Sequence, residues 1–352
     1  MTNNIDKLIN ELIRTSLKLK DKKLDKKAIS MEIKHRVEGL INEENYIYKK
    51  DYDSLRLEEI LKGIQNSKQI FVNNEGKDIQ IEYIEIPAKK KEEGKEKVIV
   101  IIPGFGASYI PFRNTVKELA QYMGNYRIIC LSPLNSGKSS SLKNSNLNKI
   151  KEIYIKAFQE LGINSDNTET TVMGHSMADI VTLELARSNP EIIKNIVLVN
   201  GISANKGNLP KITNDFLNHV NFRITPIRVI GSFKGESETA KNYWKQTLDF
   251  LKNIINPTNT LNQFKLLAER RKINLEDLLS QLKSNTLVLT ATKELTDYND
   301  VRNKIYNKLP DGIKKQHRIE VGGLHDEIIA HPEAFTLKLM SWLGSLESGK
   351  TS

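Results

Sequence analysis

Apolar residues near the N-terminus recur at intervals of three and four, which places them on one face of a helix. Two more stretches of similar spacing follow before the pattern changes at residue 67. Residues 1–66 are therefore expected to form an N-terminal helical extension. The three predicted helices lie within 5–13, 28–41 and 55–64.

From residue 67 onward, short apolar runs of strand length alternate with stretches of helical spacing. KQIFVN and DIQIEYIEI are strand-like and are joined by Asn-Glu-Gly, a hairpin turn sequence. The continuous apolar run KVIVII is typical of a strand that helices cover on both faces of a parallel sheet. The alternation predicts a doubly wound, mostly parallel α/β sheet. Its strands are expected within 68–73, 78–86, 97–102, 126–132, 169–174, 195–200, 285–291 and 317–323, and its helices within 112–123, 147–161, 177–188, 298–308 and 332–344.

The stretch that follows residue 201 interrupts this alternation and contains apolar residues at helical spacing. It begins just past the carboxyl end of a strand, where open α/β sheets bind their ligands, so we interpret it as a helical lid. Its aromatic residues Tyr243, Trp244 and Phe250 are candidates for substrate binding, and a core inside the lid is the alternative. The expected divisions are 67–201 and 285–345 for the α/β core, 202–284 for the lid and 346–352 for a disordered tail.

The composition excludes several classes of protein. A single cysteine, Cys130, rules out an intrachain disulfide framework and a metal site built from several cysteines. No apolar run reaches the roughly 18 residues that a membrane span needs. The N-terminal 20 residues are amphipathic and lack the apolar stretch of a secretory signal, so a cytoplasmic location is expected.

The chain carries 53 Lys and Arg against 43 Asp and Glu, a formal net charge of +10. We interpret this excess as a solvated surface, with an anionic partner as the alternative, and we expect no nucleic-acid partner. Between residues 14 and 27, seven basic residues stand against two acidic ones. A basic amphipathic helix there would suit a membrane surface or a partner, and packing on the main domain is the alternative. The sequence does not indicate an oligomeric state.

The segment TVMGHSMADI places a serine between a predicted strand and a predicted helix. A serine at such a tight turn projects over the edge of the sheet, and its neighbours must be small because strand and helix pass close together. Gly174 meets that need, and Ala178 adds one methyl group where glycine is usual. The helix N-terminus beside Ser176 favours developing negative charge. Ser176 is therefore the candidate nucleophile, although a helix cap is the alternative.

A second glycine-rich turn, IPGFGAS, follows the buried strand that starts at residue 97. Gly104 and Gly106 allow backbone conformations that other residues avoid. Such a turn can direct the Phe105 N–H toward a point above Ser176, and the Met177 N–H supplies a second donor. Phe105 and Met177 are thus the candidate oxyanion donors.

Two late loops supply the remaining candidate groups. His325 lies in the loop between the last predicted strand and the closing helix, and none of the other five histidines follows a late strand in this way. Glu294 comes three residues after Ala291, where a strand ends, and would orient the imidazole. Asp297 and Asp300 are rivals for that role, and Asp297 also suits a helix cap.

The order serine, acid, histidine, each after a strand, is that of α/β-hydrolases, and residues 68–344 resemble this superfamily. GHSMAD is similar to its nucleophile turn GHSMGG, and PGFGAS to its oxyanion turn HGFGGS with Pro103 for His. SPLNSGKS resembles the D-x-R-G-x-G-x-S stretch, with Ser132 for Asp and Asn135 for the first Gly. NTLVLTATKE matches the acid strand PTLVIWGEKD, and VGGLHDEIIAHPEAF matches the histidine loop.

Together these features lead us to expect a serine hydrolase with the triad Ser176, Glu294 and His325, which cleaves a carboxylic ester or thioester through an acyl-enzyme. No metal or organic cofactor is expected. The lid composition favours an apolar acyl chain. The alternatives are a membrane-surface lipase, an acyltransferase, or a binding or signalling protein that keeps the fold. A haloalkane dehalogenase is disfavoured because it needs Asp in place of Ser176.

Overall fold

The structure is a computed structural model of the chain. It describes residues 53–90, 93–104, 106–142, 146–201, 253, 256–269, 273–291, 306–313, 315–321, 327–330 and 332–348. The first two predicted N-terminal helices, much of the predicted lid and nearly all of the predicted helix 298–308 lie outside these residues.

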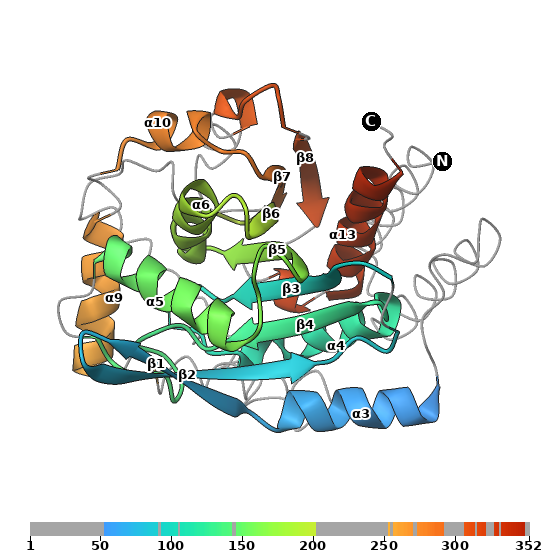
Figure 1. Cartoon of the computed structure of the whole chain (residues 1–352), viewed down its shortest axis with the longest axis horizontal. Helices are drawn as coiled ribbons and strands as arrows, with labels where there is room; N and C mark the ends of the chain where they lie inside the picture. The colour runs from blue at the N-terminus through green and yellow to red at the C-terminus, as the bar shows by residue number, and fades with distance from the viewer. Residues whose placement is uncertain are drawn as a thin grey trace, which may run out of the picture.

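An eight-stranded sheet forms the centre of the described fold, with the strand order β1-β2-β4-β3-β5-β6-β7-β8 (Figure 1). β2 runs antiparallel to β1 and β4, and all the other neighbours are parallel. The mostly parallel sheet predicted from the sequence is therefore confirmed. The strands are β1 (Lys68–Asn74), β2 (Lys77–Ile86), β3 (Glu96–Ile102), β4 (Tyr126–Leu131), β5 (Thr168–His175), β6 (Ile193–Val199), β7 (Asn285–Ala291) and β8 (Lys315–Val321).

Helices cover both faces of the sheet and create two hydrophobic cores. Alternate residues of β3 show why its sequence is apolar throughout: Val98 and Val100 enter one core, whereas Ile99 and Ile101 enter the other. The first core contains residues of α5 (Leu147–Glu160), α6 (Ala178–Ser188), α9 (Pro257–Glu269) and α10 (Leu275–Ser280). The second contains residues of α3 (Ser54–Gln65), the short 3-10 helix η1 (Ile110–Phe112), α4 (Arg113–Tyr122), α12 (Glu327–Ala330) and α13 (Pro332–Glu347).

The predicted elements that fall on described residues appear where the periodicity places them. The hairpin turn between β1 and β2 has Glu75 and Gly76 at positive φ, which suits the Asn-Glu-Gly signal. The third predicted N-terminal helix is α3, and it buries Ile60 and Ile64 in the second core. Both α9 and α10 fall within the stretch interpreted as a helical insertion. The closing helix α13 continues to Glu347, into the predicted tail.

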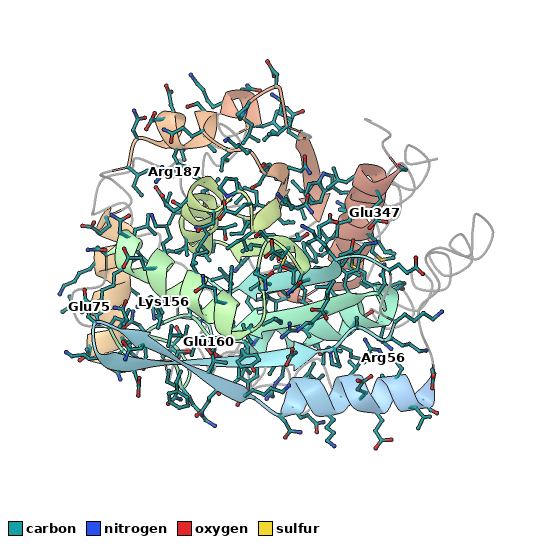
Figure 2. The ribbon with its side chains drawn as sticks, in the orientation of Figure 1. Arg56, Glu75, Lys156, Glu160, Arg187 and Glu347 are labelled. Atoms are coloured by element: carbon teal, nitrogen blue, oxygen red, sulfur yellow. The ribbon has the colours of Figure 1, made fainter. Side chains whose placement is uncertain are left out.

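Charged side chains gather on the outer faces of the helices and on the sheet margin, as Figure 2 shows for Glu75, Lys156 and Glu160. The Glu75 carboxylate pairs with Lys149 Nζ at 2.8 Å although its side chain is 76% exposed, so the pair contributes little to stability. Arg56, by contrast, is 2% exposed and donates to the Pro87 C=O, which fastens α3 to the end of β2.

The chain order around β3 locates the ligand-binding edge. Within the sheet, the chain passes from β3 to its neighbour β4 on one side and then to its neighbour β5 on the other side. Open α/β sheets bind ligands at such a reversal, outside the carboxyl ends of the strands. Gly104 follows β3 there, and Ser132 and Ser176 follow β4 and β5.

Candidate active site

The turn between β5 and α6 holds Ser176 in a left-handed conformation, with φ of 55°. Such a φ costs a residue with a side chain about 1–2 kcal/mol, so the surrounding structure must impose it. The Ser176 N–H donates to the Val199 C=O of β6 at 2.8 Å, and the Ser176 C=O accepts from the Asp179 N–H at 3.2 Å. Ser176 is partly exposed although its neighbours on both sides are buried. Ser176 is therefore more exposed than the residues on either side of it, at the turn where the sequence places the candidate nucleophile.

Small residues allow β5 and α6 to meet at this turn. A Cβ at Gly174 would stand 2.7 Å from the Ala178 C=O and would also collide with Thr182 Oγ1. Position 174 therefore tolerates only glycine. Ala178, where the resemblance leads one to expect glycine, is 3% exposed and its methyl group is accommodated inside the first core. This departure does not disturb the turn.

Asp179 is the second departure from the family's usual turn. It is completely buried in the first turn of α6, where the helix N-terminus favours a carboxylate. A Cβ on Gly201 would lie 2.5 Å from Asp179 Oδ2 and 3.0 Å from Asp179 Cβ. The chain therefore makes room for Asp179 by having glycine just after β6, and the periodicity of the sequence contains no sign of this pairing.

The glycine turn after β3 lies directly against Ser176. A Cβ on Gly104 would be 2.8 Å from Ser176 Cβ and 2.9 Å from the His175 C=O, so only glycine fits. The Ala107 N–H donates to the Gly104 C=O at 3.3 Å and closes a four-residue turn, in which Gly106 has a φ of 68°. Met177 stands immediately before α6, so its N–H belongs to the helix N-terminus.

Several predicted site residues lie outside the described residues. They are Glu294, His325, Phe105, Tyr243, Trp244, Phe250, and the rival acids Asp297 and Asp300. Their assigned roles remain predictions.

The strand ends that lead to the predicted acid and histidine are described. β6, β7 and β8 run parallel as neighbours, so β7 and β8 end at the same edge of the sheet as β5. β7 ends at Ala291, three residues before Glu294, and β8 ends at Val321, four residues before His325. After the histidine loop, Thr115 Oγ1 of α4 donates to the Ile328 C=O of α12 at 3.1 Å. Both loops thus start from rigid elements at the edge where Ser176 projects.

A buried carboxylate that the sequence analysis missed supports the loop after β4. Glu82 of β2 is 3% exposed, and its Oε2 accepts from Ser132 Oγ and from the Lys138 N–H, each at 3.0 Å. Ser132 Oγ in turn accepts from the Tyr109 N–H at 3.3 Å. Ser132 occupies the position where the resembling stretch has Asp, so Glu82 brings a carboxylate to that place from another strand. Only the register of β2 against β4 could have revealed it.

The second substitution in this loop, Asn135 for glycine, is also explained. Asn135 has a φ of 68°, a conformation that asparagine adopts more readily than most residues. Its side-chain Oδ1 accepts from the Leu142 N–H at 2.8 Å, which stabilises the loop further. The loop therefore keeps an ordered conformation despite its divergence from the usual stretch.

Three other possibilities concern the described part of the chain: a reactive cysteine, a metal site and a membrane-spanning helix. Complete burial raises the pKa of the Cys130 thiol well above its usual value, so this thiol stays protonated and inaccessible. Among the described residues no group of three or more His, Cys, Asp or Glu side chains could hold a metal ion. The same residues include no helix that is both long enough and apolar enough to span a membrane.

The fold and this serine turn define a class of protein. The family model for the alpha/beta hydrolase fold matches residues 97–332, more than half of the chain. This protein therefore belongs to the alpha/beta hydrolase family, as the sequence resemblance predicted. No curated protein is significantly similar to it in sequence.

Solved structures share this fold at low sequence identity. A probable hydrolytic enzyme from Pseudomonas aeruginosa PAO1 is 18% identical with a TM-score of 0.62, over 79% of this chain and 94% of that one. A thermophilic esterase from Thermogutta terrifontis is 14% identical with a TM-score of 0.58, over 80% and 98%. The thioesterase domain of the curacin biosynthetic pathway is 16% identical with a TM-score of 0.54, over 78% and 99%. At these identities the similarity concerns the fold alone.

Proposed function

We propose that this protein is a serine hydrolase that cleaves carboxylic esters or thioesters through a covalent acyl-enzyme. The observation that carries the proposal is the strained, partly exposed Ser176 at the N-terminus of α6. The neighbours of Ser176 impose a left-handed backbone conformation on it at the turn between strand and helix. A helix cap does not require this conformation, whereas it suits a serine whose hydroxyl must reach a substrate.

In the proposed reaction, Ser176 Oγ attacks the acyl carbon while His325 accepts its proton. His325 then passes that proton to the leaving alcohol or thiol. A water molecule next attacks the acyl carbon of the acyl-enzyme while His325 accepts its proton, and Ser176 regains that proton as the carboxylic acid leaves. Glu294 orients the imidazole. The Phe105 and Met177 N–H groups stabilise the negative oxygen of the tetrahedral intermediate. The nearness of Gly104 to Ser176 and the common edge reached by β7 and β8 support these roles.

The proposed substrate is a small molecule with an apolar acyl chain, bound in part by Tyr243, Trp244 and Phe250. The names of the similar structures, an esterase and a thioesterase, are compatible with either leaving group. We propose a cytoplasmic location, with the basic N-terminal stretch as the part suited to a membrane surface. Trp244→Ala is expected to change the chain-length profile more than the rate on acetate esters. An unchanged profile would assign this residue to the interior of the lid.

Two measurements on the full chain test the proposal. A fluorophosphonate probe should label the wild-type protein and leave a folded Ser176→Ala variant unlabelled. A panel of p-nitrophenyl and coenzyme A esters of graded chain length should then show turnover by the wild type. Absence of both labelling and turnover would favour a binding protein. Transfer of the acyl group to added glycerol would indicate an acyltransferase, and strong activation by anionic vesicles a membrane-surface lipase.

A further inference from the structure

Two buried amide side chains hold the backbone of the glycine turn that follows β3. The Gly106 N–H donates to Gln263 Oε1 at 2.7 Å, and the Gly106 C=O accepts from Asn253 Nδ2 at 3.1 Å. Gln263 is 4% exposed and Asn253 is 6% exposed. Both come from the stretch between β6 and β7, and Gln263 belongs to α9. We refer to these two residues as the amide clamp.

The amide clamp also holds the loop after β4. Gln263 Nε2 donates to the Asn135 C=O at 2.9 Å and to Ser136 Oγ at 3.2 Å. Asn253 Oδ1 accepts from the Gly137 N–H at 2.9 Å. The backbone donors and acceptors on both sides determine which amide atom is oxygen and which is nitrogen, because a backbone N–H only donates and a backbone C=O only accepts. Each amide is thus held at both ends.

The contact with Gly106 controls the direction of a peptide group. Type I and type II β-turns have similar ends and differ by a flip of the central peptide group, whose N–H belongs to the third residue of the turn. In the turn closed by Gly104 and Ala107, that third residue is Gly106, with its φ of 68°. Gln263 Oε1 stabilises the form whose N–H points toward α9. Loss of this acceptor would leave a buried N–H unsatisfied, at about 1–3 kcal/mol, and would free the backbone of the turn at Gly106, next to the proposed donor residue.

We propose that Gln263 and Asn253 are positioning residues for the glycine turn: they hold Gly106, the residue after the proposed donor Phe105, so the placement of α9 decides whether the turn is competent for catalysis. This inference rests on the proposed hydrolase function and adds to it a link between the oxyanion turn and the segment between β6 and β7. Donors that stabilise a developing oxyanion work because they are oriented before the reaction begins. Removing the clamp therefore weakens transition-state stabilisation more than substrate binding.

The test compares Gln263→Leu with Asn262→Leu in the full chain. Asn262 is the preceding residue of α9, is 3% exposed, and donates to Asn135 Oδ1 at 3.3 Å, in the loop after β4 and not in the turn after β3. Steady-state kinetics on a p-nitrophenyl ester should show kcat lowered on the order of 10-fold to 100-fold in Gln263→Leu, with KM changed by less than about threefold. Affinity for an alkyl trifluoromethyl ketone, which forms an oxyanion on the serine, should fall in parallel. Asn262→Leu should retain kcat.

A milder variant covers the event that Gln263→Leu does not fold. Gln263→Asn keeps the amide and shortens the side chain by one methylene, so the contact with Gly106 cannot be made at its present length. Its kcat should fall in the same way. Equal kcat values in the Gln263 and Asn262 variants of an active protein would overturn the clamp and leave the hydrolase function standing. An inactive wild type would refute the proposed function and this inference with it.

Discussion

The contact between Gly104 and Ser176 gives the sharpest prediction about the site. In Gly104→Ala the new Cβ would be built 2.8 Å from Ser176 Cβ and 2.9 Å from the His175 C=O. Carbon atoms pack at about 3.5–4.0 Å, so the glycine turn and the serine must separate by roughly 1 Å. The serine cannot retreat easily, because its N–H is bound to the Val199 C=O of β6.

That displacement sets the expected magnitude. A misplacement of about 1 Å between reacting groups can lower the rate by about 100-fold, which corresponds to roughly 2.7 kcal/mol in the barrier. Overpacking of a tight contact costs a further ~1–3 kcal/mol in the free energy of unfolding. We therefore expect Gly104→Ala to lower both the rate of fluorophosphonate labelling and kcat on p-nitrophenyl acetate about 100-fold, with a modest fall in Tm.

Gly124→Ala is the matched control, because its Cβ would meet only Lys89 Cβ, at 3.8 Å, an ordinary contact distance. It should retain wild-type labelling and turnover. The rates are to be measured with protein shown by circular dichroism to be folded. A Gly104→Ala protein that labels and turns over like the control would refute the reasoning, since the close packing of the turn against Ser176 would then not affect the reactivity of this serine.

Three further predictions concern the nucleophile, the acid and an ion pair. Ser176→Ala should abolish hydrolysis and leave the fold intact, and more than a few per cent of residual activity would contradict the assignment. Glu294→Gln should lower turnover by orders of magnitude with little effect on Tm, whereas Asp297→Ala should cost about 1 kcal/mol of stability as a lost helix cap; the reverse pattern would make Asp297 the triad acid. Burial raises the pKa of Glu85, but hydrogen bonds and charge attraction from Lys68 and Arg127 outweigh it and lower the pKa overall. The stability from this group is present above its unfolded pKa and is lost as pH falls through the folded one. Urea unfolding should therefore show Glu85→Gln less stable than wild type at pH 7 and the gap closing below about pH 4; a constant gap would exclude the ion pairs as its cause.

The local features of the fold were predictable from the chain because they depend on neighbours in sequence. Continuous apolar runs such as that of β3 occur where both faces of a strand are covered, and the serine turn requires small residues at fixed spacing. The order of the candidate residues along the chain was enough to indicate the family, which the family model confirms. Ser176 lies at the turn that its sequence predicts, while its role as nucleophile and the roles of Glu294 and His325 stay predictions.

The supporting contacts of the site depended instead on which strands and helices become neighbours. Glu82 reaches Ser132 from a position 50 residues earlier, and Gln263 reaches Gly106 from one 157 residues later. Neither residue differs in local pattern from an ordinary polar residue of a strand or a helix. Their roles arise because buried polar groups must find hydrogen-bond partners, and only the folded arrangement decides which groups are within reach. The sequence by itself thus determined the sheet, the turns and the choice of Ser176 as candidate nucleophile, and the tertiary structure decided which distant side chains hold those turns in place.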